Sequence, residues 1–284
     1  MNRTLASLLA ASALAIAAPA RAVSPDADGS LVNTLGHNAR VRLHSEVGAL
    51  AVPRHTIQFS KTGSRIDYVD EAGQDNLFLF LRLSADIDVG DRHTIVFLYQ
   101  PIDLRTKALA PRDLVVDGAT FEKGTLVNHR YGFGFWRGSW LRDLKPDSDR
   151  ELALGAGLQI RNATIDFESG DGTQFRSNRD IGPVPLLKAR VRQPLDNGWW
   201  MGAEVDGFYA PIKYINGSNT DVVGSILDAS LRAGLEVRPG VDGFVNLRYV
   251  TGGAEGTSDA TGPGDGFTYN YIHLVALSLG FSVR

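Results

Sequence analysis

Charged side chains stand at alternate positions within apolar segments of this 284-residue chain, and they are the residues whose types and spacing could support chemistry. In the segment 187–192, for example, Lys188, Arg190 and Arg192 alternate with leucine, alanine and valine. Successive side chains of a β-strand point to opposite faces, so this spacing predicts one charged and one apolar face. The charges with this pattern are Arg82, Asp86, Arg161, Lys188, Arg190, Arg192, Glu204, Asp206, Asp228, Arg232, Glu236 and Arg248.

Both signs of charge are interleaved in this set, which favours a network of ion pairs. Arg190 and Glu204 fall on neighbouring predicted strands, where opposite charges paired across the strands contribute about 0.2–1 kcal/mol each. A structural network is therefore the preferred interpretation. A narrow pore lined by charges and a proton-transfer or hydrolytic site are the alternatives.

The histidines give little support for an enzyme. No two of the six have the H-x-x-x-H spacing of a metal site. His44 and Ser45 are adjacent, but neighbours on a strand point to opposite faces. An acid and histidine site at the outer rim would use Asp166, Asp171, Asp180 and His129. The sequence leaves the catalytic residues unknown, and we predict no metal and no cofactor. Enzyme activity stays undecided, with a protein that is not an enzyme as the favoured interpretation.

Residues 268–283 show most clearly what kind of strand carries these charges. Odd positions are aromatic and then aliphatic, whereas even positions are mostly small or polar. This segment is longer than a typical soluble strand of about 5–6 residues. It fits a tilted transmembrane strand, which needs about 9–11 residues. The pattern therefore indicates an all-β fold, namely an antiparallel up-and-down transmembrane β-barrel.

Short and long connections alternate along the rest of the chain. Short polar turns at 88–91, 145–149, 196–198 and 238–243 alternate with longer Gly/Asp/Asn-rich connections at 70–76, 105–125, 169–180, 213–223 and 255–266. This alternation is typical of outer-membrane barrels, whose short turns are periplasmic. It predicts ten strands, with eight or twelve as alternatives and a soluble β-sandwich as the other fold considered. They are 54–69, 77–87, 92–104, 126–143, 150–168, 182–195, 198–212, 224–237, 243–254 and 268–283.

The charged face of these strands should line the lumen, since Arg or Lys at the centre of a lipid-facing strand costs about 2–4 kcal/mol. Aromatic residues near the strand ends would then form girdles at the membrane interfaces. The candidates are Tyr68, Tyr99, Tyr131, Phe133, Phe135, Trp199, Tyr209, Tyr249, Tyr269 and Tyr271. Arg137 conflicts with this assignment because it is in phase with Phe133 and Phe135, so either a bulge redirects it or the phase is wrong.

The N-terminus and the composition point to export. Residues 1–22 read as a signal peptide, with a basic start, an apolar centre and an Ala-x-Ala cleavage site. Residues 23–53 form an N-terminal lead-in segment that could be a cap, a plug or an extra strand, and residues 54–284 form the barrel. The chain has no cysteine, and its net charge of −3 gives no sign of a nucleic-acid partner.

Four longer sequence segments show a family resemblance: 159–165, 178–186, 206–216 and 252–258. They resemble a group of uncharacterised bacterial outer-membrane β-barrel proteins over about residues 54–283. The resemblance implies the fold and the membrane, and it implies no activity or catalytic residue. One departure is the C-terminus, which ends in Ser-Val-Arg after Phe281 instead of on an aromatic residue.

These observations predict a porin-like barrel in the outer membrane of a Gram-negative bacterium. Its role would be structural, binding or the passage of small solutes, and the alternative is a membrane-embedded hydrolase acting on lipid A or a surface substrate. The expected partners are outer-membrane lipid, lipopolysaccharide and the barrel-assembly machinery; any partner protein is unknown.

Overall fold

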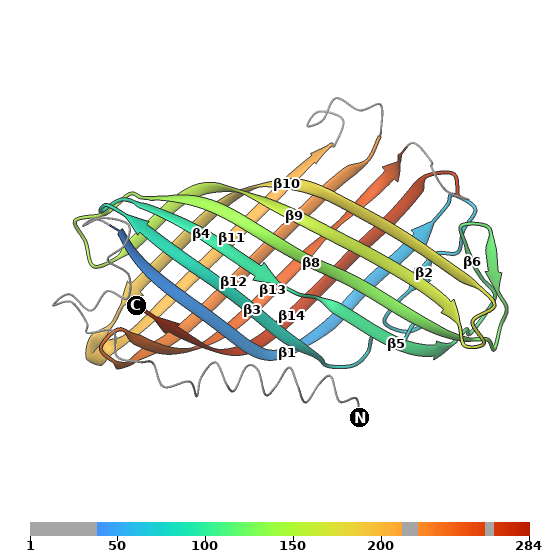
Figure 1. The fold of residues 1–284 in the computed structure, drawn as a ribbon, viewed down its shortest axis with the longest axis horizontal. Helices are drawn as coiled ribbons and strands as arrows, with labels where there is room; N and C mark the ends of the chain where they lie inside the picture. The colour runs from blue at the N-terminus through green and yellow to red at the C-terminus, as the bar shows by residue number, and fades with distance from the viewer. Residues whose placement is uncertain (1–38, 212–220, 259–263) are drawn as a thin grey trace.

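The computed structural model describes residues 39–211, 221–258 and 264–284. Apart from one short 3-10 turn (η1, Asp196–Gly198), the regular structure in these ranges is all strand. No helix in the same ranges is long and apolar enough to cross a membrane. The strands, coloured in chain order in Figure 1, are β1 (Ala39–Phe59), β2 (Ile66–Asp67), β3 (Phe78–Val89), β4 (His93–Gln100), β5 (Asp103–Leu109), β6 (Leu114–Val116), β7 (Ala119–Phe121), β8 (Leu126–Asp143), β9 (Glu151–Ser169), β10 (Phe175–Pro194), β11 (Trp199–Pro211), β12 (Val223–Arg238), β13 (Val241–Thr257) and β14 (Phe267–Val283).

These strands form a closed, antiparallel, ten-strand barrel, as the sequence predicted. Each strand from β8 to β14 pairs with the next, and β14 pairs with β1 to close the wall. β4 and β5 together fill one position in the wall, because both pair with β8. The short β2 pairs with the end of β1, and β6 and β7 form a separate hairpin.

The first strand begins earlier than predicted, so the boundary at residue 54 is wrong. β1 starts at Ala39, and residues 39–51 pair with β3 and β14. Of the three alternatives for the lead-in segment, this agrees with a strand and not with a cap or plug, but the strand is continuous with residues 54–59 and is not an extra one. Pro53 lies at an irregularity between Ala51 and Arg54, where the pairing with β14 shifts. Since a proline and a bulge both interrupt a regular ladder, one continuous strand reads in the sequence as two segments. The predicted signal peptide lies outside the described residues.

Two predicted connections are also partly strand. Residues 175–180 extend β10 and pair with β9, which leaves only 170–174 as the connection. The segment 105–125 contains most of β5 and the β6–β7 hairpin.

The outer face of the barrel is apolar along most of its height. In β14, Leu277, Leu279 and Phe281 are more than half exposed, while Ala276 and Ser278 between them are buried. This is the alternation predicted from the sequence. Large exposed apolar residues occur on the other strands too, including Leu43, Leu83, Phe97, Trp136, Leu158, Leu187, Met201, Leu231 and Leu247.

The interior has two zones. At the end with the long connections it is an apolar core, and the loops that contribute to it include Tyr68, Leu114 and Phe121, each no more than 1% exposed. The loop after β1 and the β6–β7 hairpin are joined by a hydrogen bond, in which the Ser64 amide donates to the Val115 carbonyl at 2.7 Å. The β6–β7 hairpin lies at the end of the barrel away from the C-terminus (Figure 1). The zone nearer the short turns is polar and contains the charged residues.

The apolar zone explains Arg137. β8 pairs with β9 in an unbroken ladder, so no bulge redirects this side chain. Tyr131, Phe135 and Arg137 are all buried and face the interior, whereas Trp136 is 62% exposed. The assignment of Tyr68, Tyr131, Phe133 and Phe135 to an outer girdle is therefore wrong. These rings pack with or against the interior core, because inserted loops make that part of the lumen apolar.

Candidate functional site

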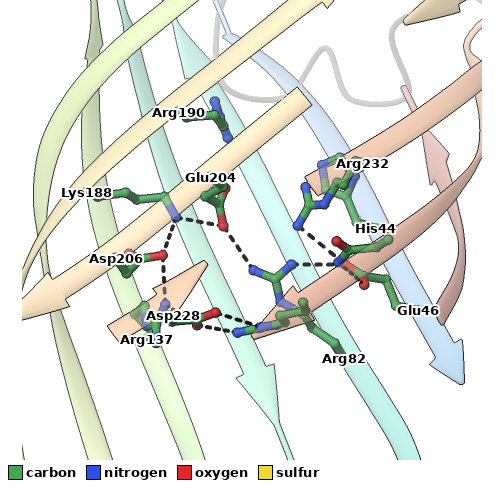
Figure 2. A network of polar contacts seen from close by, with 12 residues as sticks. His44, Glu46, Arg82, Arg137, Lys188, Arg190, Glu204, Asp206, Asp228 and Arg232 are labelled. Carbon is green, nitrogen blue, oxygen red and sulfur yellow. Dashed lines mark hydrogen bonds and ion pairs between the residues drawn. The ribbon is translucent and has the colours of Figure 1, made fainter. Parts of the chain in front are cut away.

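A cluster of buried charges crosses the interior and is the most distinctive polar feature of the described chain. We call it the central ion cluster, and Figure 2 shows most of its members. The strands β1, β3, β8, β10, β11, β12 and β13 each place at least one member on their inward face. The members are Glu46, Arg82, Arg137, Lys188, Glu204, Asp206, Asp228, Arg232 and Arg248.

Arg137 joins the two aspartates of the cluster. Its Nη1 atom lies 2.9 Å from a carboxylate oxygen of Asp206 and 2.9 Å from one of Asp228. Asp228 also accepts a hydrogen bond from Nε of Arg248 at 2.7 Å, and a second contact makes this pair bidentate. Gln159 accepts from Nε and Nη2 of Arg137 at 3.1 and 2.7 Å, which holds the guanidinium in place.

Lys188 and Arg82 extend the cluster across the barrel. The Lys188 ammonium lies 3.0 Å from Asp206 and 2.9 Å from Glu204. Arg82 then joins Glu204 at 3.1 Å to Glu46 at 2.9 Å. The cluster is therefore one connected chain of ion pairs from β8 to β1.

Glu46 ends this chain of ion pairs and has neutral as well as charged partners. Its carboxylate accepts hydrogen bonds from Asn246 at 2.7 Å and Ser278 at 2.9 Å, and Arg232 approaches at 3.4 Å. The Glu46 side chain is 1% exposed, so these bonds replace its contacts with water. A buried carboxylate needs such partners, since an unpaired one costs several kcal/mol.

Two smaller groups of charges lie between the cluster and the short turns. In the first, Arg190 contacts Asp86 at 2.6 Å and Glu151 at 2.7 Å, and His44 approaches Asp86 at 3.6 Å. Arg42 adds a contact to Asp88 at 3.1 Å. In the second, Asp242 lies 3.3 Å from Arg192 and 3.5 Å from Arg284, and Arg284 also contacts Glu236.

The charges of the cluster and these two groups balance. The cations are Arg42, Arg82, Arg137, Lys188, Arg190, Arg192, Arg232, Arg248 and Arg284, and the anions are Glu46, Asp86, Asp88, Glu151, Glu204, Asp206, Asp228, Glu236 and Asp242. Apart from His44, these residues together have no net charge. An ion crossing this part of the lumen would have to break existing pairs.

The structure separates the residues predicted from the sequence into four environments. Arg82, Lys188, Glu204, Asp206, Asp228, Arg232 and Arg248 belong to the central ion cluster, and Asp86, Arg190 and Arg192 belong to the adjoining groups. Arg161 lies apart from them and pairs with Asp180. Glu236 is exposed and contacts Arg284, so it lies at the edge of the lumen.

Sequence reasoning missed Glu46, Arg137, Gln159, Asn246 and Ser278. Glu46 alternates with aliphatic residues of the segment 43–50, and this signal would have placed it on an inward face. Arg137 gave a signal too, but the aromatic residues in phase with it were assigned to the outer face. Neutral residues such as Asn246 show nothing in the sequence that sets them apart.

The residues considered for hydrolysis are not brought together. His129 faces the interior between the rings of Tyr68 and Phe167, while Asp166 lies on the outer face of β9 with Ser177 and Arg130. His44 faces the lumen and Ser45 is exposed, as expected for neighbours on a strand.

The acidic connection after β9 is a turn held by its own side chains. Asp171 accepts hydrogen bonds from the Ser169 hydroxyl at 2.6 Å and from the Thr173 amide at 3.1 Å. These bonds lower the pKa of Asp171 to about 2. The Asp171 carboxylate therefore has its hydrogen-bond partners within the turn itself. Among the described residues, no group of three or more His, Cys, Asp or Glu side chains is arranged to hold a metal ion.

No protein-family model and no curated protein matches the chain. Solved structures align with the chain at low identity and with TM-scores below 0.5. The outer membrane protease OmpT from Escherichia coli aligns at 10% identity and a TM-score of 0.47, over 86% of this chain and 96% of that one. Ail, the attachment invasion locus protein of Yersinia pestis, aligns at 10% identity and a TM-score of 0.36, over 85% and 98%. The toluene transporter TodX of P. putida aligns at 10% identity and a TM-score of 0.30, over 88% and 90%.

Proposed function

We propose that the chain is an outer-membrane barrel with a structural or binding role and a lumen closed to solutes. A closed barrel pairs the backbone groups of its wall between neighbouring strands, as hydrocarbon requires, and the apolar outer face suits contact with lipid. The short turns would face the periplasm, and the long connections would face outward among lipopolysaccharide. Export by a signal peptide and insertion by the barrel-assembly machinery are part of this proposal.

The observation that carries the proposal is the central ion cluster. Its chain of pairs crosses the interior, and the Arg82, Arg137, Lys188 and Asp206 side chains are 1–4% exposed. A pore selects by charge only where an open water path passes its charged ring. A small-solute pore is therefore the weaker interpretation. The hydrolase alternative has less support, because the residues considered for it do not come together in the described part of the chain.

Conductance of the refolded barrel in a planar bilayer tests this proposal. We expect the wild-type protein to give no reproducible current steps, with folding checked by its strand circular dichroism and heat-modifiable gel mobility. A porin of known conductance in the same bilayer provides the positive control. Regular steps whose size or ion preference changes in Glu204→Lys or Arg190→Glu would show an open, charge-lined path and refute the closed lumen.

A further inference from the structure

A histidine, an arginine and a tryptophan meet on the outer face of the barrel, at the end with the short turns. His93 is the first residue of β4, directly after the turn from β3, and its cross-strand partner on β8 is Arg142. Trp140, two residues before Arg142 on the same strand, is 47% exposed, whereas Leu141 between them is buried. Trp140 and Arg142 therefore point away from the lumen, and Arg142 is exposed.

Trp140 holds the imidazole of His93 in one orientation. Its Nε1 donates to Nδ1 of His93 at 3.2 Å, and the two rings stack with centroids 5.6 Å apart and an interplanar angle of 21°. An indole nitrogen can only donate a hydrogen bond, so Nδ1 of His93 accepts and the neutral ring carries its proton on Nε2. Nε2 of His93 is thereby set as a donor beside the guanidinium of Arg142.

The neighbours of this pair on the outer face are apolar. Val89 lies opposite His93 on β3, and Leu154 lies opposite Arg142 on β9. They are 43% and 50% exposed. The pair therefore marks the edge of the apolar outer face, next to the short turns. An arginine on a lipid-facing strand costs about 0–1 kcal/mol near such an interface, where lipid headgroups begin.

The charge of Arg142 is not cancelled by an acid of the described chain. Arg142 forms no ion pair among the described residues. Asp88 belongs to an ion pair of the lumen, and Asp143 accepts two backbone hydrogen bonds at its own turn. Asp91 is exposed in the turn beside Arg92, so these two charges offset each other. The outer face thus presents one positive charge and one neutral donor.

We propose that His93 and Arg142 bind the phosphodiester group of a phospholipid in the leaflet at the short-turn end. A phosphodiester carries a single negative charge, which matches the single charge of Arg142. One of its oxygens accepts from the guanidinium in a charge-assisted bond, and the other accepts from Nε2 of His93. Trp140 positions the imidazole and packs against the glycerol end of the lipid. This site rests on the outer-membrane location proposed above, in which the leaflet is periplasmic.

Native mass spectrometry of the refolded protein from dodecyl maltoside, a detergent without phosphate, tests the site. We expect one molecule of dioleoyl phosphatidylglycerol to be retained. Dioleoylglycerol has the same chains without the phosphate and should bind at least about tenfold more weakly, as for one lost charged hydrogen bond. Arg142→Gln should weaken binding of phosphatidylglycerol about tenfold, and Arg142→Lys, which keeps the charge, should weaken it less. His93→Phe keeps a ring beside Trp140 and should weaken binding several-fold.

Arg105→Gln is the matched control, because Arg105 is an exposed arginine of β5 that already pairs with Asp103. It should retain phosphatidylglycerol as the wild type does. Equal retention of the two lipids, or retention of phosphatidylglycerol that neither Arg142→Gln nor His93→Phe lowers, would overturn the site.

Insertion into phosphatidylglycerol vesicles tests the membrane location separately. A folded barrel that does not insert would refute the outer-membrane location and this site with it. A barrel that inserts, but whose lipid retention is the same in all variants, would refute the site alone. Heat-modifiable gel mobility shows in each case that the variant is folded.

Discussion

At the scale of single residues, Arg137 shows how the buried charges of the lumen depend on one another. It pairs with both Asp206 and Asp228 in a site where all three side chains are 1–4% exposed. Burying charges is costly, and the cost is offset only while each charge keeps its partners. Removing one partner of a buried pair therefore lowers stability more than replacing the whole pair with apolar residues.

Replacing Arg137 with leucine should destabilise the barrel by about 3–5 kcal/mol, because two carboxylates are left without their shared cation. Urea unfolding in detergent or lipid measures this change. The control is Arg112→Leu, whose pair with Glu71 is partly exposed and should contribute no more than about 1 kcal/mol. Similar losses in both variants would mean that the central pairs contribute no more than surface pairs.

Gly234 makes room for Trp200. A Cβ atom at this position would lie 2.4 Å from two carbons of the indole ring, and the packing leaves no space for it. Gly234→Ala should therefore displace the ring, and one of the four resonances of 5-fluorotryptophan-labelled protein should shift. Gly134→Ala is the matched control, since nothing lies within 4 Å of its Cβ position. Unchanged spectra for Gly234→Ala would contradict the observed position of the ring.

At the scale of elements, β10 is paired along only part of one edge. It pairs with β9 along residues 175–192 but with β11 only along 187–194. The unpaired stretch contains Pro183 and Pro185, which have no N–H to donate. The two strands diverge toward the long-connection end (Figure 1). Fewer ladder hydrogen bonds therefore hold the wall together at this seam.

Hydrogen exchange should show this difference within one strand. In residues 176–186, amides that point away from β9 lack a ladder partner among the described residues and should exchange faster than those that point toward β9. In residues 187–193 both sets should be protected, because β10 has two neighbours there. Equal protection along the whole strand would mean that another segment covers its edge.

At the scale of the whole molecule, closure depends on β1. Its residues 43–59 pair with β14 on one side, and residues 39–50 pair with β3 on the other. β1 also contributes Glu46, so the central ion cluster is complete only in the closed barrel. The wall and the charges inside it thus stabilise each other.

Deleting residues 39–53 should prevent folding, because β3 and β14 lose the strand that joins them. Heat-modifiable gel mobility after refolding into detergent gives the readout, and a chain that begins at Ala39 is the comparison. If residues 39–53 formed a separate cap or plug instead, the barrel should still fold after their deletion. A compact, heat-modifiable product from the deletion would contradict the role of β1 in closure.

The sequence by itself determined the fold class, the number of strands and the outward face of strands such as β14. These features depend on local alternation, which any half-buried strand must show. The sequence also identified most of the inward charges. Where charges alternate with aliphatic residues along a strand, the aliphatic face is the one that lies toward lipid, so the charges must face the lumen.

The tertiary structure decided what the lumen contains. Tyr131 and Phe135 read as lipid-facing from their pattern, but inserted loops make their end of the interior apolar. β1 read as two segments because Pro53 interrupts the alternation, although pairing with β14 continues on both sides of it. Glu46 meets Arg82 and Asn246 only when the barrel closes, because these contacts join residues far apart in the chain. Alternation records which face a side chain occupies, whereas the partner on that face is set by the register and closure of the whole wall.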